Sequence, residues 1–239
     1  MSQARHYHIL VSSREKFFTK PKISFLSKMG IGFLGCALLA AYPLCKILPR
    51  SFGWENGVLE NTQAFVLFLG FGFALYFAYR TRKSLLAKLW LAATPFWFFL
   101  FGRELAWGAD FLPPLRIDLS GPVLPSSNAL WYKPAVYPLL AVFLLWGLYL
   151  FFKNRLYRIL FELMREKRFP FAEFGIAVLA FLISTSAEHH GFIRFEIASG
   201  RNQLLEELTE LLFDLGLFIT QLNVFFQTSL ALNKFQRSR

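Results

Sequence analysis

Three segments of this chain, 61–79, 134–152 and 215–233, each run for 19 residues without a charged side chain. A helix that crosses the hydrocarbon core of a bilayer needs about 20 mostly apolar residues. The chain as a whole is 55% hydrophobic, and 30 of its 239 residues are Phe. Soluble domains of this length do not carry so much apolar surface. The sequence therefore predicts an integral membrane protein.

The apolar segments predict an all-α bundle of six transmembrane helices, at about 29–48, 59–79, 86–107, 134–152, 170–190 and 205–230. These helices would form one domain, 29–230, between a basic tail, 1–28, and a second tail, 231–239. Between the fourth and fifth spans, segment 153–168 has apolar residues on one helical side and basic residues on much of the remainder. Such a pattern is typical of an amphipathic helix on a membrane surface.

The net charge of +11 first suggests nucleic-acid binding, but its distribution indicates topology instead. Of the 26 Lys and Arg residues, six lie in 1–28, four in 80–88, six in 153–168 and three after 233. The positive-inside rule places these segments, and with them both termini, in the cytoplasm. We expect a multi-pass protein of the bacterial inner membrane whose inner face contacts anionic lipids. We expect no nucleic-acid partner.

The last span carries polar residues at heptad spacing, and this polar stripe consists of Gln203, Glu207, Glu210, Asp214, Gln221 and Thr228. At about 100° per residue, their side chains fall on one helical face. Acids on one face of a membrane helix usually mark a functional interior. For Gln221 and Thr228 we expect hydrogen bonds between helices. A solvated extension before Leu215 is the competing interpretation of the acids, and an oligomer interface through helix 203–230 is a further one.

The third and fifth spans are short between their charges. Segments 89–102 and 174–187 each hold 14 uncharged residues, which is about 21 Å of helix against a core of about 30 Å. Flanking charges must then enter the membrane edge, unless the bilayer thins locally. We therefore expect an outward-facing pocket near the periplasmic side, lined by Glu60, Gln63, Arg103, Glu104, Glu207, Glu210 and Asp214. Carboxylates this close repel one another unless a cation shares the space.

A divalent metal is the alternative occupant, with Glu188, His189 and His190 as ligands. The usual HExxH and paired ExxH patterns are absent, and adjacent histidines diverge by about 100° if they are helical. An interfacial histidine pair at a helix end explains them equally well.

Three short patches, Glu60-x-x-Gln63, Arg103-Glu104-Leu105 and Glu206-Glu207-x-x-Glu210, resemble a pattern in uncharacterised bacterial multi-pass inner-membrane proteins. The resemblance implies topology and marks these patches, but it implies no activity.

Three functions follow as hypotheses. The first is proton- or cation-coupled transport, with Glu207, Glu210 and Asp214 binding the cation and Arg103 balancing charge. The second is a metal-dependent enzyme that acts on a lipid or lipid-linked substrate at the outer leaflet. The third is an assembly or scaffold subunit, and whether the chain is an enzyme at all stays open.

Overall fold

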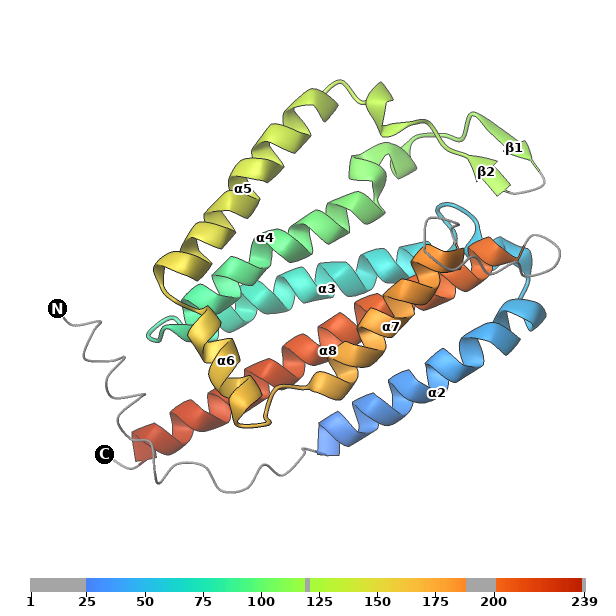
Figure 1. Cartoon of the computed structure of the whole chain (residues 1–239). Coiled ribbons are helices and arrows are strands. Elements are labelled where there is room, and N and C mark those ends of the chain that lie inside the picture. Colours follow the sequence, from blue (N-terminus) through green and yellow to red (C-terminus); the bar gives the residue numbers. More distant parts are fainter. Residues whose placement is uncertain (1–24, 119–120, 188–200, 238–239) are drawn as a thin grey trace.

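The computed structural model describes residues 25–118, 121–187 and 201–237. Figure 1 shows a bundle of long helices, and the described α-helices are α2 (Phe25–Ile47), α3 (Val58–Arg80), α4 (Leu86–Glu104), α5 (Lys133–Lys153), α6 (Tyr157–Arg165), α7 (Phe171–Ala187) and α8 (Asn202–Arg237). Short 3-10 helices are η1 (Arg50–Gly53), η2 (Ala106–Phe111) and η3 (Ser127–Ala129). The helical bundle predicted from the sequence is therefore confirmed in its general class.

The long helix α8 lies at the centre of the bundle and packs against α2, α3 and α7. Helix α4 packs against α3, and α5 packs against α4. The buried apolar residues lie between the helices that pack together. One part lies between α2, α7 and α8 around Leu34, Ala180 and Leu212. Another part joins α3, α4, α6 and α8 around Phe77, Trp90 and Leu156.

Four helical segments in the described part of the chain are long and apolar enough to cross a membrane, and these are Ser27–Ile47, Arg50–Arg80, Lys133–Lys153 and Asn202–Ser229. Helix α7 is apolar but shorter. Helices α4 and α7 contain the two segments, 89–102 and 174–187, that have only 14 uncharged residues between flanking charges. Four of the six predicted spans thus have the length and apolar character that a membrane crossing requires.

The two ends of the bundle differ in their connections. Helix η1, η2 and a small hairpin lie at one end, which we call the hairpin end, whereas α6 and the α3–α4 turn lie at the other, the α6 end. The hairpin consists of β1 (Arg116–Asp118) and β2 (Gly121–Val123), which pair antiparallel. It is the one element of the described residues that an all-α prediction omits.

Two helix ends, those of α4 and α8, differ from the predicted spans. Helix α4 ends at Glu104 rather than at Trp107, because the backbone turns left-handed there, with φ of 59° at Trp107 and 103° at Gly108. Gly108 adopts its value without steric cost. The Trp107 ring packs onto Gly102, where a Cβ atom would lie 2.3 Å from Cζ3 of the ring. Helix α8 continues to Arg237, so the predicted tail 231–239 is helical over most of its length.

Helix α6 lies within the predicted segment 153–168 and has the expected two-sided character. Leu156 and Leu163 are buried in the core, and Ile159 and Leu160 pack against it, whereas Arg158 and Arg165 are exposed. The burial of one apolar side against α3 and α4 explains why this short helix lies across the ends of the longer ones (Figure 1).

Candidate functional site

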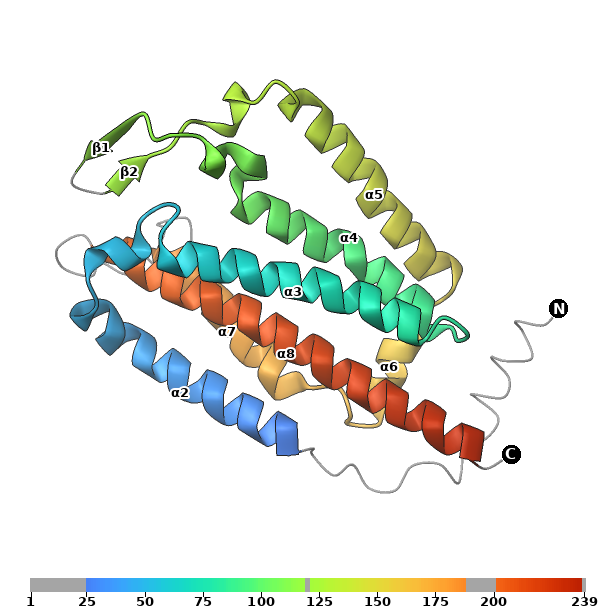
Figure 2. The same cartoon turned by 180° about the vertical axis from the view of Figure 1, so that it is seen from behind.

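The seven residues predicted for the pocket come from three helices that meet toward the hairpin end. Glu60 and Gln63 lie in the first turns of α3, and Arg103 and Glu104 lie at the end of α4. Glu207, Glu210 and Asp214 lie in the first half of α8. Because α3 packs against both α4 and α8, these segments are adjacent (Figure 2). We call this set the acidic cluster.

Two polar contacts join the helices of the acidic cluster directly. The Gln63 side chain donates its Nε2 hydrogens to the backbone oxygen of Glu207 at 2.8 Å and to its Oε2 at 3.0 Å. Arg103 Nη2 and Glu210 Oε1 form an ion pair at 2.5 Å. The first contact connects α3 to α8, and the second connects α4 to α8.

The remaining carboxylates interact through space. Glu104 is half-buried and lies within the electrostatic field of Glu60, Glu207, Glu210 and Asp214. Arg103 is the single basic member of the acidic cluster, and it is already paired with Glu210. Five carboxyl groups therefore share one guanidinium, and a bound cation would reduce their mutual repulsion.

Asp214 is the most deeply buried acid of the cluster, with only 3% of its surface exposed. Its Oδ2 atom has no hydrogen-bond partner among the described residues. The Oε1 atom of Gln63, which is fully buried, also lacks one. Buried polar atoms are normally hydrogen-bonded, so each such exception requires an explanation. Here two of them occur in one cluster.

Glu60 also has a local structural role that the sequence did not reveal. Its Oε2 accepts a hydrogen bond from the backbone N–H of Asn56, which has a left-handed φ of 55°. Asn56 in turn donates from Nδ2 to the backbone oxygen of Asp110 at 3.0 Å. Glu60 therefore stabilises the η1–α3 turn and its connection to η2.

Asp110 extends the negative charge beyond the membrane-spanning helices. Burial raises the pKa of its carboxyl above the ordinary value, and the negative charge of Glu55 raises it further. The side chain is only 9% exposed.

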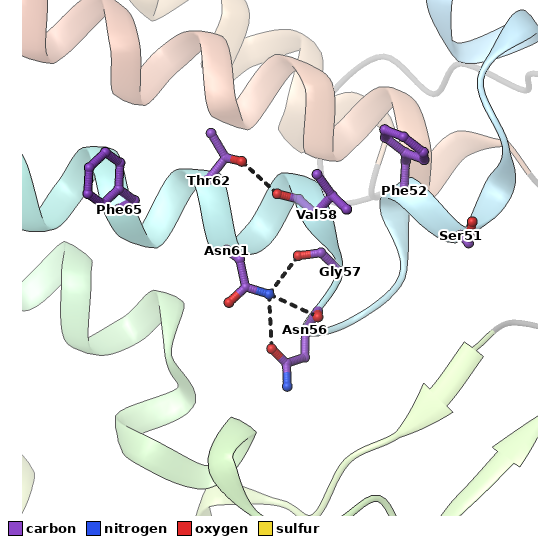
Figure 3. A pocket seen from close by; sticks show the side chains of 8 residues that line it. All are labelled: Ser51, Phe52, Asn56, Gly57, Val58, Asn61, Thr62 and Phe65. Atoms are coloured by element: carbon purple, nitrogen blue, oxygen red, sulfur yellow. Dashed lines mark hydrogen bonds between the residues drawn. The ribbon is translucent and has the colours of Figure 1, made fainter.

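A surface hollow lies beside the acidic cluster at the start of α3 (Figure 3). It is lined by Ser51, Phe52, Asn56, Gly57, Val58, Asn61, Thr62 and Phe65, so its wall contains none of the predicted acids. Asn61 donates from Nδ2 to the backbone oxygens of Asn56 and Gly57 and to Asn56 Oδ1, which holds the α3 N-terminus in place.

The two residues of the inner half of the polar stripe, Gln221 and Thr228, form different kinds of hydrogen bond. Gln221 donates from Nε2 to the backbone oxygen of Gly70 at 3.0 Å, which is the expected interhelical hydrogen bond. Thr228 instead donates to Val224 and Phe225 of its own helix, so the interhelical bond predicted for it was wrong. A threonine hydroxyl reaches the carbonyls of its preceding turn, and this local bond needs no partner helix. Helices of the same chain cover the polar face of α8.

A second buried acid, Glu173, was not singled out from the sequence. It lies in the first turn of α7 with 1% of its surface exposed. Its Oε1 accepts hydrogen bonds from Asn223 Nδ2 at 2.9 Å and from Ser27 Oγ at 2.5 Å. The signal was available, because Glu173 precedes a run of 14 uncharged residues, but the sequence does not indicate its partners.

The metal ligands predicted as the alternative, Glu188, His189 and His190, lie outside the described residues. Within residues 25–118, 121–187 and 201–237, no three His, Cys, Asp or Glu side chains converge closely enough to ligate one metal ion. The acids of the acidic cluster thus share an electrostatic field without forming a set of metal ligands.

Comparisons of the chain with protein-family models, with curated proteins and with solved structures found no match. The functional argument therefore depends on the arrangement of the side chains.

Proposed function

We propose that this chain is a proton-coupled membrane transporter whose coupling site is the acidic cluster, with Asp214 as the central proton-binding group. The observation that carries the proposal is the nearly complete burial of Asp214, with one carboxylate oxygen unpartnered beside Arg103, Glu104 and Glu210. Ionisable residues inside membrane spans are costly and usually serve a proton or ion pathway.

A proton fits this cluster better than a metal ion for a geometric reason. A metal ion requires several ligands at fixed short distances, and the described acids do not converge in that way. A proton needs one carboxylate oxygen, and the Oδ2 atom of Asp214 has no other partner among the described residues. A protonated carboxyl is neutral and donates a hydrogen bond, which reduces the cost of burying an unpaired charge.

The topology that goes with this proposal has six spans, both termini in the cytoplasm, and the acidic cluster near the periplasmic face of a bacterial inner membrane. Two basic segments, 80–88 and 153–168, support it because they lie at the same end of the bundle, opposite the cluster (Figure 1). In this arrangement α4 and α7 cross the bilayer alongside the longer helices.

The test is a proton-jump measurement on the reconstituted protein. Proteoliposomes are adsorbed on a solid-supported membrane, the pH is stepped, and the transient displacement of charge is recorded. We expect a transient in the native protein that is lost in Asp214→Asn, which keeps the size of the side chain but cannot ionise. Asp118→Asn, the same change on the exposed hairpin, should leave the transient intact. An unchanged transient in Asp214→Asn would overturn the proposal.

A further inference from the structure

The carboxylate of Glu173 is the most completely buried acid of the described residues and lies apart from the acidic cluster. It is held by three helices, since it belongs to α7, Asn223 donates to it from α8, and Ser27 donates to it from α2. Both donors are neutral, and no basic side chain pairs with Glu173 in the described part of the chain. Lys28, which follows Ser27, is exposed.

The position of Glu173 separates it from Asp214 by the body of α8. Asn223 follows Asp214 by nine residues, which at about 100° per residue places the two on opposite faces of the helix and about 13 Å apart along it. Asp214 faces Arg103 of α4, whereas Asn223 faces Glu173 of α7. Glu173 also lies at the start of α7, toward the α6 end, whereas the acidic cluster lies toward the hairpin end.

A purely structural role would not require an acid at this position. A glutamine side chain also offers an acceptor oxygen to Asn223 and Ser27, and it avoids the large cost of burying a carboxylate with neutral partners. The structure also provides a route to the carboxylate, because Ser27 is partly exposed while its hydroxyl donates to Glu173 Oε1. A hydroxyl both donates and accepts, so it can pass a proton on.

We propose that Glu173 is a second proton-binding site, which exchanges protons through Ser27 with the side of the membrane at the α6 end. In this step hydronium gives a proton to the Ser27 hydroxyl oxygen and becomes water, while the hydroxyl's own proton passes to Glu173 Oε1. The serine therefore ends unchanged, and the carboxylate becomes a neutral carboxyl. The role of Glu173 as the inner counterpart of the acidic cluster rests on the proposed function. The protonation of Glu173 is measured separately.

The experiment is an infrared difference spectrum of the reconstituted protein between high and low pH, read at the carbonyl stretch of protonated carboxyl groups. We expect a band that is absent in Glu173→Gln and present in Asp214→Asn. Glu162→Gln, the same change at an exposed position of α6, serves as the control and should retain the band. A spectrum of Glu173→Gln identical to that of the native protein would overturn the proposal.

A second variant tests the route without changing the acid. Ser27→Ala leaves the carboxyl in place, so after a rapid pH jump the Glu173 band should appear more slowly but reach the native amplitude. If the band appears at the native rate, Ser27 is not the route. The two proposals fail separately, because a native charge transient in Asp214→Asn refutes the coupling site, whereas a retained band in Glu173→Gln refutes the second site.

Discussion

At Gly70 the Trp97 ring of α4 packs directly against the backbone of α3, and replacement of this glycine by alanine tests the packing that assembles the acidic cluster. A Cβ atom at Gly70 would lie 2.3 Å from Cε3 and 2.5 Å from Cζ3 of Trp97. The Trp97 ring is 4% exposed, so neighbouring side chains leave it little room to move. Gly70→Ala therefore forces α3 and α4 apart or displaces the ring.

The magnitude follows from two opposing terms. Alanine in place of glycine inside a helix ordinarily stabilises the helix by about 1 kcal/mol. An added methyl group in a filled core costs about 1–3 kcal/mol. Gly72 supplies the matched control, because a Cβ atom there has no heavy atom within 4 Å. Both variants gain the helical term, so Gly70→Ala should be less stable than Gly72→Ala by about 1–3 kcal/mol.

The measurement is the free energy of unfolding in mixed micelles, obtained by titration with a denaturing detergent. The charge transient after a proton jump should also fall in Gly70→Ala, because α3 carries Glu60 and Gln63 while α4 carries Arg103. Changing Trp97 to leucine in the Gly70→Ala background should recover part of the stability, as expected for two residues in contact. Equal unfolding free energies for the two alanine variants would refute the packing argument.

Three further substitutions test two separate parts of the structure by the same unfolding assay. Gln221→Leu removes an interhelical hydrogen bond and should cost about 0.6 kcal/mol, whereas Thr228→Val should be close to neutral because the hydroxyl bonds only to its own helix; a larger cost for Thr228→Val would contradict this contact pattern. For Asp110, burial and then the charge of Glu55 raise the pKa, so the folded state binds the proton more tightly than the unfolded state. Stability should therefore fall as pH rises from the unfolded pKa of about 3.9 toward the raised folded value. Asp110→Asn should flatten this slope and be more stable than the native protein at neutral pH; an unchanged slope would exclude Asp110 as its source.

The acidic cluster was predictable because it depends on spacing and length. Residues 207, 210 and 214 differ by three and four positions, so their side chains share a face of any helix that contains them. The 14 uncharged residues before Arg103 are too few for a full span. This short length predicted that Glu104 is partly buried. The structure places Glu104 half-buried among the acids of the other helices.

The contacts of Glu173 and Thr228 were not predictable, since periodicity assigns a face to a residue but does not name its partner. Glu173 is 50 positions from Asn223 and 146 from Ser27, and only the packing of α2, α7 and α8 brings the three together. The end of α4 escaped prediction for a different reason. The backbone reverses at Trp107 and Gly108, and no apolar periodicity encodes such a turn.

The central place of α8 explains why it tolerates acids that a lipid-facing helix does not. Helix α5, largely exposed, has no charge between Lys133 and Lys153, because an acid facing lipid at mid-membrane costs about 2.5–3.5 kcal/mol. Protein covers Asp214 instead, yet its Oδ2 has no partner among the described residues, so part of that cost persists. Asp214→Asn should then be at least as stable as the native protein while it loses the charge transient. A variant that lost both would make Asp214 a residue of structure rather than of proton coupling.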